Sequence, residues 1–167
     1  MDTSAHDYLM RCVRFNQKDL YLIWYSADDE KDDCHVVLDE NRYIRVFHDV
    51  PSLQRFAGEN QIAFELEEPI FCNFDIVKSW LQNPRRRSVS QRDFLSVWNL
   101  CHDIANSVND PKFVAYIDQH IWLWDGLLFS ARPIRYKRDV MVLRRVLAHG
   151  IELFRSHIAL SSKEIEC

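Results

Sequence analysis

The sequence predicts an α+β fold in which an N-terminal antiparallel β-meander packs against a C-terminal set of helices within a single domain. Three observations lead to this prediction. Short runs of β-forming residues separated by polar connections fill residues 1–70, whereas residues 71–167 carry apolar side chains at helical spacing. The chain has 167 residues, of which 47% are hydrophobic and 28% are charged, as in one globular domain. Strands followed by helices are typical of the α+β class.

The strands of the first half are predicted from runs of aliphatic, aromatic and β-branched residues. Residues 20–26 are apolar on both faces, as expected for a buried strand, and a strand over 8–15 is expected before them. Residues 34–38 and 42–47 flank a polar connection of hairpin length. Residues 62–66 are a further candidate strand.

The first helices are predicted from their start and stop signals. Residues 53–57 form a short helical pattern that Gly58 is expected to stop. Asn73 or Asp75 is expected to cap the next helix, which Pro84 closes.

The second half carries the longest helical patterns. Ser90-Gln-Arg-Asp93 resembles a capping box, and an apolar stripe follows it from Phe94 to Val108. Residues 113–124 suit either a buried helix or a helix followed by a short strand, and Asp125-Gly126 is expected to end them. The clearest helix is predicted over residues 136–158.

Composition excludes several classes of function. Three glycines are too few for a phosphate-binding loop of the dinucleotide or Walker type. No apolar run approaches the roughly 20 residues that span a bilayer, and the first residues are acidic where a secretory signal is basic. The five cysteines are scattered and include no C-x-x-C pair, which is typical of reduced thiols. We therefore expect a soluble cytoplasmic protein without a cofactor.

Histidines and carboxylates offer candidate metal sites, each of them incomplete. His102-Asp103 is similar to the core of metal-dependent phosphohydrolases but lacks the further histidine and aspartate of such a site. His149 and Glu152 are three residues apart on the last predicted helix and would fill half of a coordination sphere. We expect these to be ordinary boundary or surface residues.

A general acid–base pair is the other catalytic candidate. His35 and His48 lie on or beside adjacent predicted strands, with Lys31 as the nearest lysine in the sequence. A small hydrolase or nuclease with a His/carboxylate site therefore remains an alternative function. The motifs of serine hydrolases and zinc proteases are absent, and we expect a protein that is not an enzyme.

Charge is distributed unevenly along the chain. Residues 1–80 hold 16 Asp and Glu against 8 Lys and Arg, whereas residues 81–167 hold 9 against 13. Basic residues cluster at Arg85, Arg86 and Arg87, so a nucleic-acid-binding protein is a second alternative. The acidic residues cluster in one predicted loop, which contains Asp28, Asp29, Glu30, Asp32 and Asp33. Such a loop either solubilises a turn or steers a basic partner.

The order of several motifs resembles a known family. The sequence runs from Arg-Val-Phe-His-Asp at 45–49 through Asp75…Trp80-Leu81 and Phe94-Leu95…Val97-Trp98-Asn99-Leu100…Asp103…Ser107 to Ile121-Trp122 and a long final helix. Together these motifs, which span most of the chain, resemble small bacterial immunity proteins that protect a cell from its own contact-dependent growth inhibition toxin. Trp124 and Leu127-Leu128 depart from the small, polar loop that the family pattern leads us to expect.

The resemblance implies a non-enzymatic protein that binds a cognate toxin domain and blocks its active site or its substrate path. Many such toxins are basic nucleases, and an acidic surface on the inhibitor would mimic the phosphates that they bind. We therefore expect the partner-binding residues to be those of the acidic loop at 28–33 together with Glu65, Glu67 and Glu68.

Overall fold

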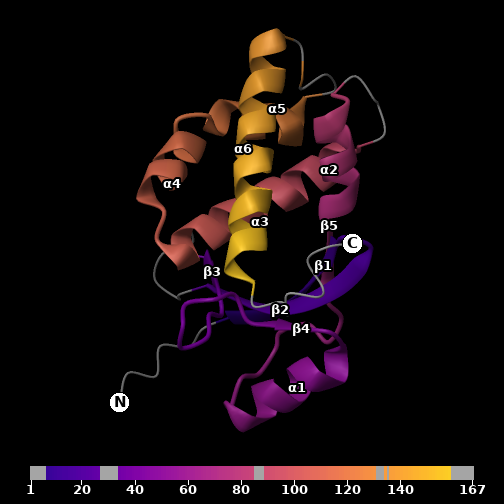
Figure 1. Ribbon diagram of the computed structural model, residues 1–167, viewed down its shortest axis with the longest axis vertical. Helices are drawn as coiled ribbons and strands as arrows, with labels where there is room; N and C mark the ends of the chain where they lie inside the picture. The colour runs from indigo at the N-terminus through magenta and orange to yellow at the C-terminus, as the bar shows by residue number, and fades with distance from the viewer. Residues whose placement is uncertain (1–6, 27–33, 85–88, 131–133, 135, 159–167) are drawn as a thin grey trace. The chain divides into compact units, whose positions relative to one another are not determined.

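The computed structural model describes residues 7–26, 34–84, 89–130, 134 and 136–158 (Figure 1). The described residues up to Cys72, together with His157 and Ile158, form one compact unit, here called the N-terminal unit. The described residues from Asn73 to Ser156 form a second, here called the helical unit. Strands dominate the first and helices the second, so the predicted α+β class is confirmed.

A five-stranded sheet is the centre of the N-terminal unit. Its strands are β1 (Asp7–Phe15), β2 (Lys18–Ser26), β3 (Cys34–Val36), β4 (Val46–Phe47) and β5 (Ile70–Asn73). The order is β3-β2-β1-β5, and β4 also pairs with β2. The pairs β1–β2, β2–β3 and β2–β4 are antiparallel. The strands expected over 8–15 and 20–26 are thus present and form the long central hairpin.

A two-residue turn joins β1 to β2. Asn16 and Gln17 both adopt positive φ angles, 51° and 62°. Two consecutive residues of this kind make the turn whose twist matches that of the flanking strands, and it sets the register at Phe15↔Lys18. The same register places Arg14 opposite Asp19.

One face of the sheet is covered by helix α1 (Val50–Glu59), as Figure 1 shows. Met10 of β1, Ile23 of β2 and Leu53 of α1 are buried together at the centre of this contact. On the other face of the sheet Leu20 and Leu22 are also buried, so β2 is apolar on both faces, as expected for this strand.

Helix α1 is longer than its sequence pattern predicts. The Asp49 side chain accepts a hydrogen bond from the Ser52 N–H and caps the first turn. The expectation that Gly58 stops the helix is wrong, because Gly58 keeps a helical backbone and the turn closes at Asn60 instead. The Asn60 N–H donates to the carbonyl groups of Phe56 and Ala57.

The strand expected over 42–47 is reduced to β4 and to two isolated bridges at Ile44, one of them antiparallel to Leu38. The Asp39 carboxylate accepts hydrogen bonds from the backbone N–H groups of Asn41, at 2.8 Å, and Tyr43, at 2.9 Å. Arg42 between them has a φ angle of 66°. The side chain of Asp39 therefore accepts hydrogen bonds from backbone N–H groups that would otherwise be available to pair with a neighbouring strand.

The strand expected over 62–66 is likewise absent except for one bridge. Phe64 pairs with Tyr8 in parallel orientation, and the Glu65 N–H donates to the Tyr8 carbonyl. The strand does not extend through the following residues, Glu67-Glu68-Pro69, because proline has no N–H to donate to a neighbouring strand.

The end of the chain returns to the N-terminal unit. The Ile44 N–H donates to the carbonyl of His157 at 2.6 Å, and Ile44 forms a parallel bridge with Ile158. Both isoleucines are buried. The N-terminal unit is therefore built from two separate stretches of sequence, with the helical unit between them.

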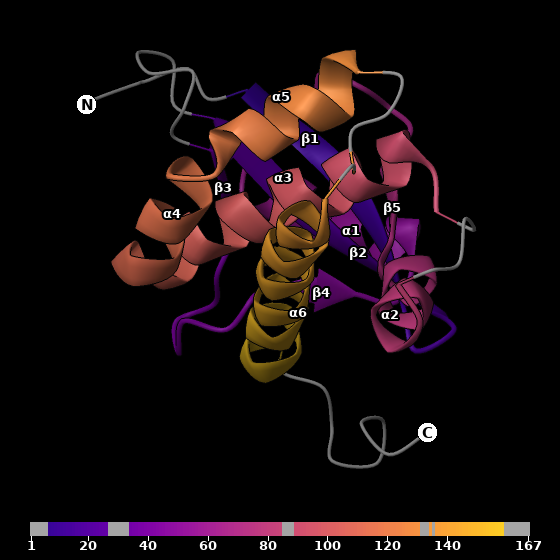
Figure 2. The same ribbon diagram turned by 90° about the horizontal axis from the view of Figure 1, so that it is seen from above.

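The helical unit contains α2 (Phe74–Gln82), α3 (Gln91–Val108), α4 (Pro111–Asp118), α5 (Ile121–Phe129) and α6 (Lys137–His157). Helix α3 contacts α2, α4 and α5, and Figure 2 shows α6 beside it. Aromatic side chains fill the interior. Phe74 meets Phe154 edge-on at 5.2 Å between ring centroids, and Trp80 meets Phe94 at 4.9 Å.

Helices α3 and α6 approach each other closely at Gly150. A Cβ atom at Gly150 would lie 2.2 Å from the Sγ and 2.3 Å from the Cβ of Cys101, well inside van der Waals contact. Cys101 is fully buried. Glycine is required here because no side chain fits between the two helices.

The helix starts follow their sequence signals. Asn73 rather than Asp75 caps α2, since its side chain accepts from the Ile76 N–H. Ser90 and Asp93 form the predicted capping box at the start of α3.

The ambiguous pattern over 113–124 is resolved as two short helices. Helix α4 ends at Asp118, and α5 begins at Ile121 without a side-chain cap. Helix α5 continues through Asp125-Gly126, where an end was expected. The Trp124 indole N–H donates to the Asn99 side-chain oxygen of α3 at 2.7 Å, which ties α5 to α3.

Candidate functional site

Three of the predicted contact residues lie together on the surface of the N-terminal unit. Glu65, Glu67 and Glu68 are all exposed. The Glu65 N–H bonds to the Tyr8 carbonyl at 3.1 Å, which holds the segment against the start of β1. The carboxylates therefore stand beside the edge of the sheet rather than on a strand.

Two apolar side chains are exposed in the same stretch. Leu66, between the glutamates, is 49% exposed, and Phe71 of β5 is 47% exposed. We call Glu65, Leu66, Glu67, Glu68 and Phe71 the acidic edge. Exposed apolar groups that alternate along the chain with exposed carboxylates are typical of a surface that binds another protein.

A guanidinium group packs against the Phe71 ring. Arg14 of β1 lies 5.2 Å from the Phe71 ring centroid and also forms two hydrogen bonds to the carboxylate of Asp19, at 2.7 and 2.8 Å. The hydrogen bond from Arg14 lowers the pKa of the Asp19 carboxyl. Because Asp19 takes up the charge of Arg14, this guanidinium does not offset the carboxylates of the acidic edge.

The acidic loop at 28–33, with Asp28, Asp29, Glu30, Asp32 and Asp33, lies outside the described residues. The residues that flank it are described. Ser26 of β2 pairs with both Asp7 of β1 and Cys34 of β3, at the end of the sheet. The next rung is formed by Tyr8, Tyr25 and His35. The chain therefore leaves for the loop and returns from it one rung away from Tyr8, to which the acidic edge is bonded.

Aromatic rings line this end of the sheet. The ring centroids of Tyr8 and Tyr25 are 5.9 Å apart, and those of Tyr25 and His35 are 5.5 Å apart. All three side chains are half-buried. The sequence does not single out Tyr8, Leu66 or Phe71 as site residues. Cross-strand register is what brings the rings of Tyr8, Tyr25 and His35 together, and a single sequence does not reveal register.

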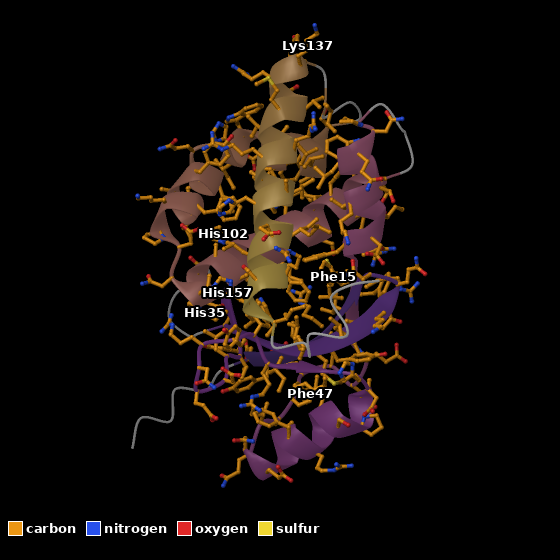
Figure 3. All side chains as sticks on the ribbon, in the orientation of Figure 1. Phe15, His35, Phe47, His102, Lys137 and His157 are labelled. Atoms are coloured by element: carbon orange, nitrogen blue, oxygen red, sulfur yellow. The ribbon has the colours of Figure 1, made fainter. Side chains whose placement is uncertain are left out.

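The structure separates the acid–base candidate residues of the N-terminal unit. His35 is paired with Tyr25, whereas His48 follows β4, whose Phe47 is paired with Tyr21. Positions 21 and 25 of β2 are four residues apart, which is roughly 13 Å along a strand. Figure 3 shows His35 and Phe47 well apart on the sheet. The structure therefore does not bring these two candidate histidines together. Lys31 lies outside the described residues.

The candidate metal residues of the helical unit have other partners. His102 of α3 lies 3.4 Å from the Asp118 carboxylate, and His149 of α6 lies 3.2 Å from that of Asp110. The Glu152 carboxylate accepts hydrogen bonds from the Nε and Nη2 atoms of Arg155. The hydrogen bond from Arg155 lowers the pKa of the Glu152 carboxyl. Within the described part of the chain, no three His, Cys, Asp or Glu side chains are grouped as metal ligands.

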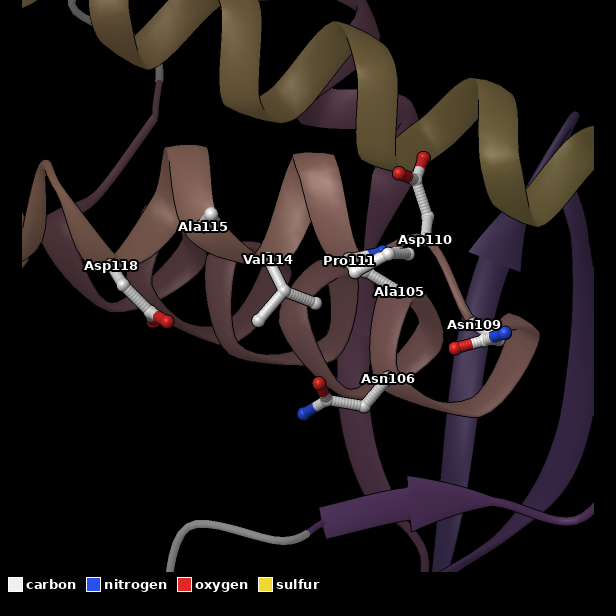
Figure 4. A pocket seen from close by; sticks show the side chains of 8 residues that line it. All are labelled: Ala105, Asn106, Asn109, Asp110, Pro111, Val114, Ala115 and Asp118. Atoms are coloured by element: carbon white, nitrogen blue, oxygen red, sulfur yellow. The ribbon is translucent and has the colours of Figure 1, made fainter.

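An open pocket of about 230 Å³ lies between the end of α3 and the start of α4 (Figure 4). Its lining includes Asn106, Asn109, Asp110 and Asp118. Figure 4 shows the Asp110 carboxylate directed toward α6, where His149 meets it. Asp110 also accepts a hydrogen bond from a backbone N–H of α4. These two carboxylates therefore tie α4 to its neighbours and do not form a pair within the pocket.

The basic run of Arg85, Arg86 and Arg87 lies outside the described residues. Four cysteines are described, and all four are free thiols, with Cys12, Cys72 and Cys101 buried and Cys34 half-buried. Burial raises the pKa of the Cys12 thiol. Among the described residues, no helix is long and apolar enough to cross a membrane.

Comparisons with known proteins bear on the fold. No protein-family model matches the sequence, and no curated protein matches it. A solved structure described as the C-terminal domain of SatS in complex with bromine is similar, with a TM-score of 0.58 and 13% sequence identity. The similarity covers 90% of this chain and 92% of that one. At this level of identity the likeness is one of fold alone: this chain shares its α+β architecture with the SatS C-terminal domain.

Proposed function

We propose that this protein is an immunity-type inhibitor that binds and neutralises a cognate bacterial toxin domain in the cytoplasm, with the acidic edge as part of the contact. The observation that carries the proposal is the exposed run Glu65-Leu66-Glu67-Glu68, followed along the chain by the exposed ring of Phe71. It combines carboxylates, which attract a basic partner, with apolar groups that a partner can bury. The family resemblance of the sequence points in the same direction.

The two kinds of side chain have different tasks in this mechanism. Glu65, Glu67 and Glu68 steer a basic nuclease domain toward the inhibitor and occupy positions that nucleic-acid phosphates would take. Leu66 and Phe71 supply affinity, because burying the exposed half of each is worth about 2 kcal/mol at roughly 25 cal/mol per Å². Inhibition needs only that the bound edge covers the active site or the path of the substrate, so no catalytic group is required of this chain.

The partner to test is a toxin domain encoded immediately upstream of this gene, where we expect one. Glu67→Gln/Glu68→Gln should slow association with that domain about 3- to 10-fold at low salt, because two steering charges are lost. The association rate of the unchanged protein should fall as salt rises, and that of the variant should fall less steeply. Stopped-flow fluorescence measures both.

The matched control is Glu40→Gln/Glu59→Gln, which removes the same charge from exposed positions outside the acidic edge. Equal slowing by both pairs would mean that only net charge matters, and the acidic edge would then not be the contact. Leu66→Ser/Phe71→Ser should accelerate dissociation at least 10-fold. Unchanged dissociation would remove these side chains from the interface.

A further inference from the structure

A row of stacked aromatic and cationic side chains runs along α6 where it faces α4 and α5. The Arg138 guanidinium carbon lies 4.8 Å from the Trp122 ring centroid, and that of Arg145 lies 4.3 Å from the Tyr116 ring centroid. His149 continues the row, with its ring 4.2 Å from that of Phe113. Arg138, Arg145 and His149 are seven and four residues apart on α6, so they share one face of the helix.

The two arginines keep their hydrogen-bonding capacity. A guanidinium group stacked on a ring still presents its N–H edges in its own plane. Within the ranges that the structure describes, Arg138 and Arg145 have no carboxylate within 4.0 Å. Both side chains are exposed. They are therefore oriented by the rings and ready to bind carboxylates of another molecule.

Apolar side chains are exposed among these cations. Met141 is 70% exposed and lies three residues after Arg138 and four before Arg145, on the same side of α6. Ile121 and Trp122 of α5 are 49% and 38% exposed. Tryptophan, tyrosine, methionine and arginine are the residues enriched in protein–protein interfaces.

The chemistry of this surface favours a protein segment over a nucleic acid. Met141 and Ile121 have no counterpart to contact on a phosphate backbone, and nucleic-acid surfaces are continuously basic. Here the neighbouring helices α4 and α5 carry the exposed carboxylates of Asp118 and Asp125, and α5 has no lysine or arginine. A partner that places an apolar group over Met141 and carboxylates over Arg138 and Arg145 would contact each of these side chains with a group of matching chemistry.

We propose that Arg138, Met141 and Arg145, with Ile121 and Trp122, form a docking surface for an amphipathic helix of a partner protein that carries carboxylates on either side of an apolar side chain. Arg138 and Arg145 are seven residues apart, about 10 Å along α6. The partner helix therefore carries Asp or Glu seven positions apart, with a large apolar residue three or four positions after the first. This surface goes beyond the toxin-inhibitor function and does not depend on it.

Selection of random 16-residue peptides displayed on phage tests the proposal. Peptides enriched on the intact chain should carry the spacing of two acidic residues around an apolar one. Synthetic copies, measured by fluorescence anisotropy, should bind Met141→Ser at least 10-fold more weakly, and Arg138→Gln/Arg145→Gln likewise. Met141 is mostly exposed, so its replacement leaves the fold intact, which circular dichroism checks. Glu67→Gln/Glu68→Gln should bind the peptides unchanged, which separates this surface from the acidic edge.

Several results would overturn the proposal. These are the absence of any enriched peptide, a basic consensus, or peptides that bind Met141→Ser as well as the unchanged chain. Tighter binding to phosphatidylglycerol vesicles or to single-stranded DNA than to the peptides would assign the surface to a lipid or a nucleic acid. Dimerisation in sedimentation velocity that Met141→Ser abolishes would assign it to a second copy of the chain.

Discussion

Replacing Gly150 with alanine should destabilise the protein, although alanine is the better helix former. The new Cβ would lie 2.2 Å from the Cys101 Sγ, and an ordinary contact needs 3.4 Å or more. Helices α3 and α6 must therefore separate by about 1.2 Å, or the buried Cys101 side chain must be displaced, within a close-packed interior. Overpacking of this kind costs about 3 kcal/mol, and the helix propensity of alanine returns roughly 1 kcal/mol.

We expect a net loss of about 2 kcal/mol for Gly150→Ala. With an m-value of about 2 kcal/mol/M in urea, the midpoint should fall by about 1 M in a denaturation curve followed by circular dichroism. Gly58→Ala is the matched control, since nothing lies within 4 Å of a Cβ there. That change should stabilise by up to about 1 kcal/mol.

A second-site change sharpens the test. Cys101→Ala removes the Sγ but leaves the Cβ, which is itself 2.3 Å from the added atom, so it should restore little of the lost stability. Cys101→Gly removes both atoms and should restore part of it in the double variant. If Gly150→Ala is neutral or stabilising, helix propensity alone governs the position and the steric reasoning fails.

Three further predictions concern a cap, an ion pair and a thiol. Ser90→Ala should lower the free energy of unfolding by about 1 kcal/mol in urea titrations, because the Asp93 N–H at the start of α3 loses its acceptor; an unchanged midpoint would contradict this. Asp19→Asn should flatten the pH dependence of stability below about pH 4. A carboxyl whose pKa is lowered in the folded state stabilises the protein above its unfolded pKa, and this contribution is lost as the pH falls through its folded pKa. Acid titrations that coincide for both proteins would refute the prediction. Cys34, which is half-buried, should react with a thiol reagent well before Cys12, whose pKa burial raises, and mass spectrometry of quenched samples should show that order.

Local signals made much of the fold predictable. The capping box at Ser90 and the apolar runs of β1 and β2 are short-range features that tertiary contacts left unchanged. Where prediction failed, a tertiary or side-chain contact decided the outcome. Asp39 accepts hydrogen bonds from backbone N–H groups at the start of the strand expected over 42–47. Gly58 remained helical, and the helix closes at Asn60, whose backbone and side-chain N–H groups both donate to the Phe56 carbonyl.

The candidate site was predictable in its charge and not in its apolar part. Glu65, Glu67 and Glu68 are exposed because carboxylates without partners stay in water. In the sequence Leu66 and Phe71 look like core residues, because they are large and apolar. Their exposure depends on how the chain runs between the bridge at Phe64 and the short strand β5, which the sequence alone does not reveal. The same holds for the row on α6, because cations on one helix meet rings on two others only in the folded chain.

The bridge between Ile44 and Ile158 affects the order in which parts of the protein can fold during synthesis. As the chain emerges from the ribosome, the Ile44 N–H lacks its acceptor, the His157 carbonyl, until the whole helical unit has been synthesised. The hydrogen bond from Ile44 to His157 spans more than a hundred residues, so closing it carries a large chain-entropy cost unless the intervening helices fold first. We therefore expect the segment around Ile44 to be the last part of the sheet to become protected from hydrogen exchange during synthesis. Truncation before His157 should leave that part permanently open.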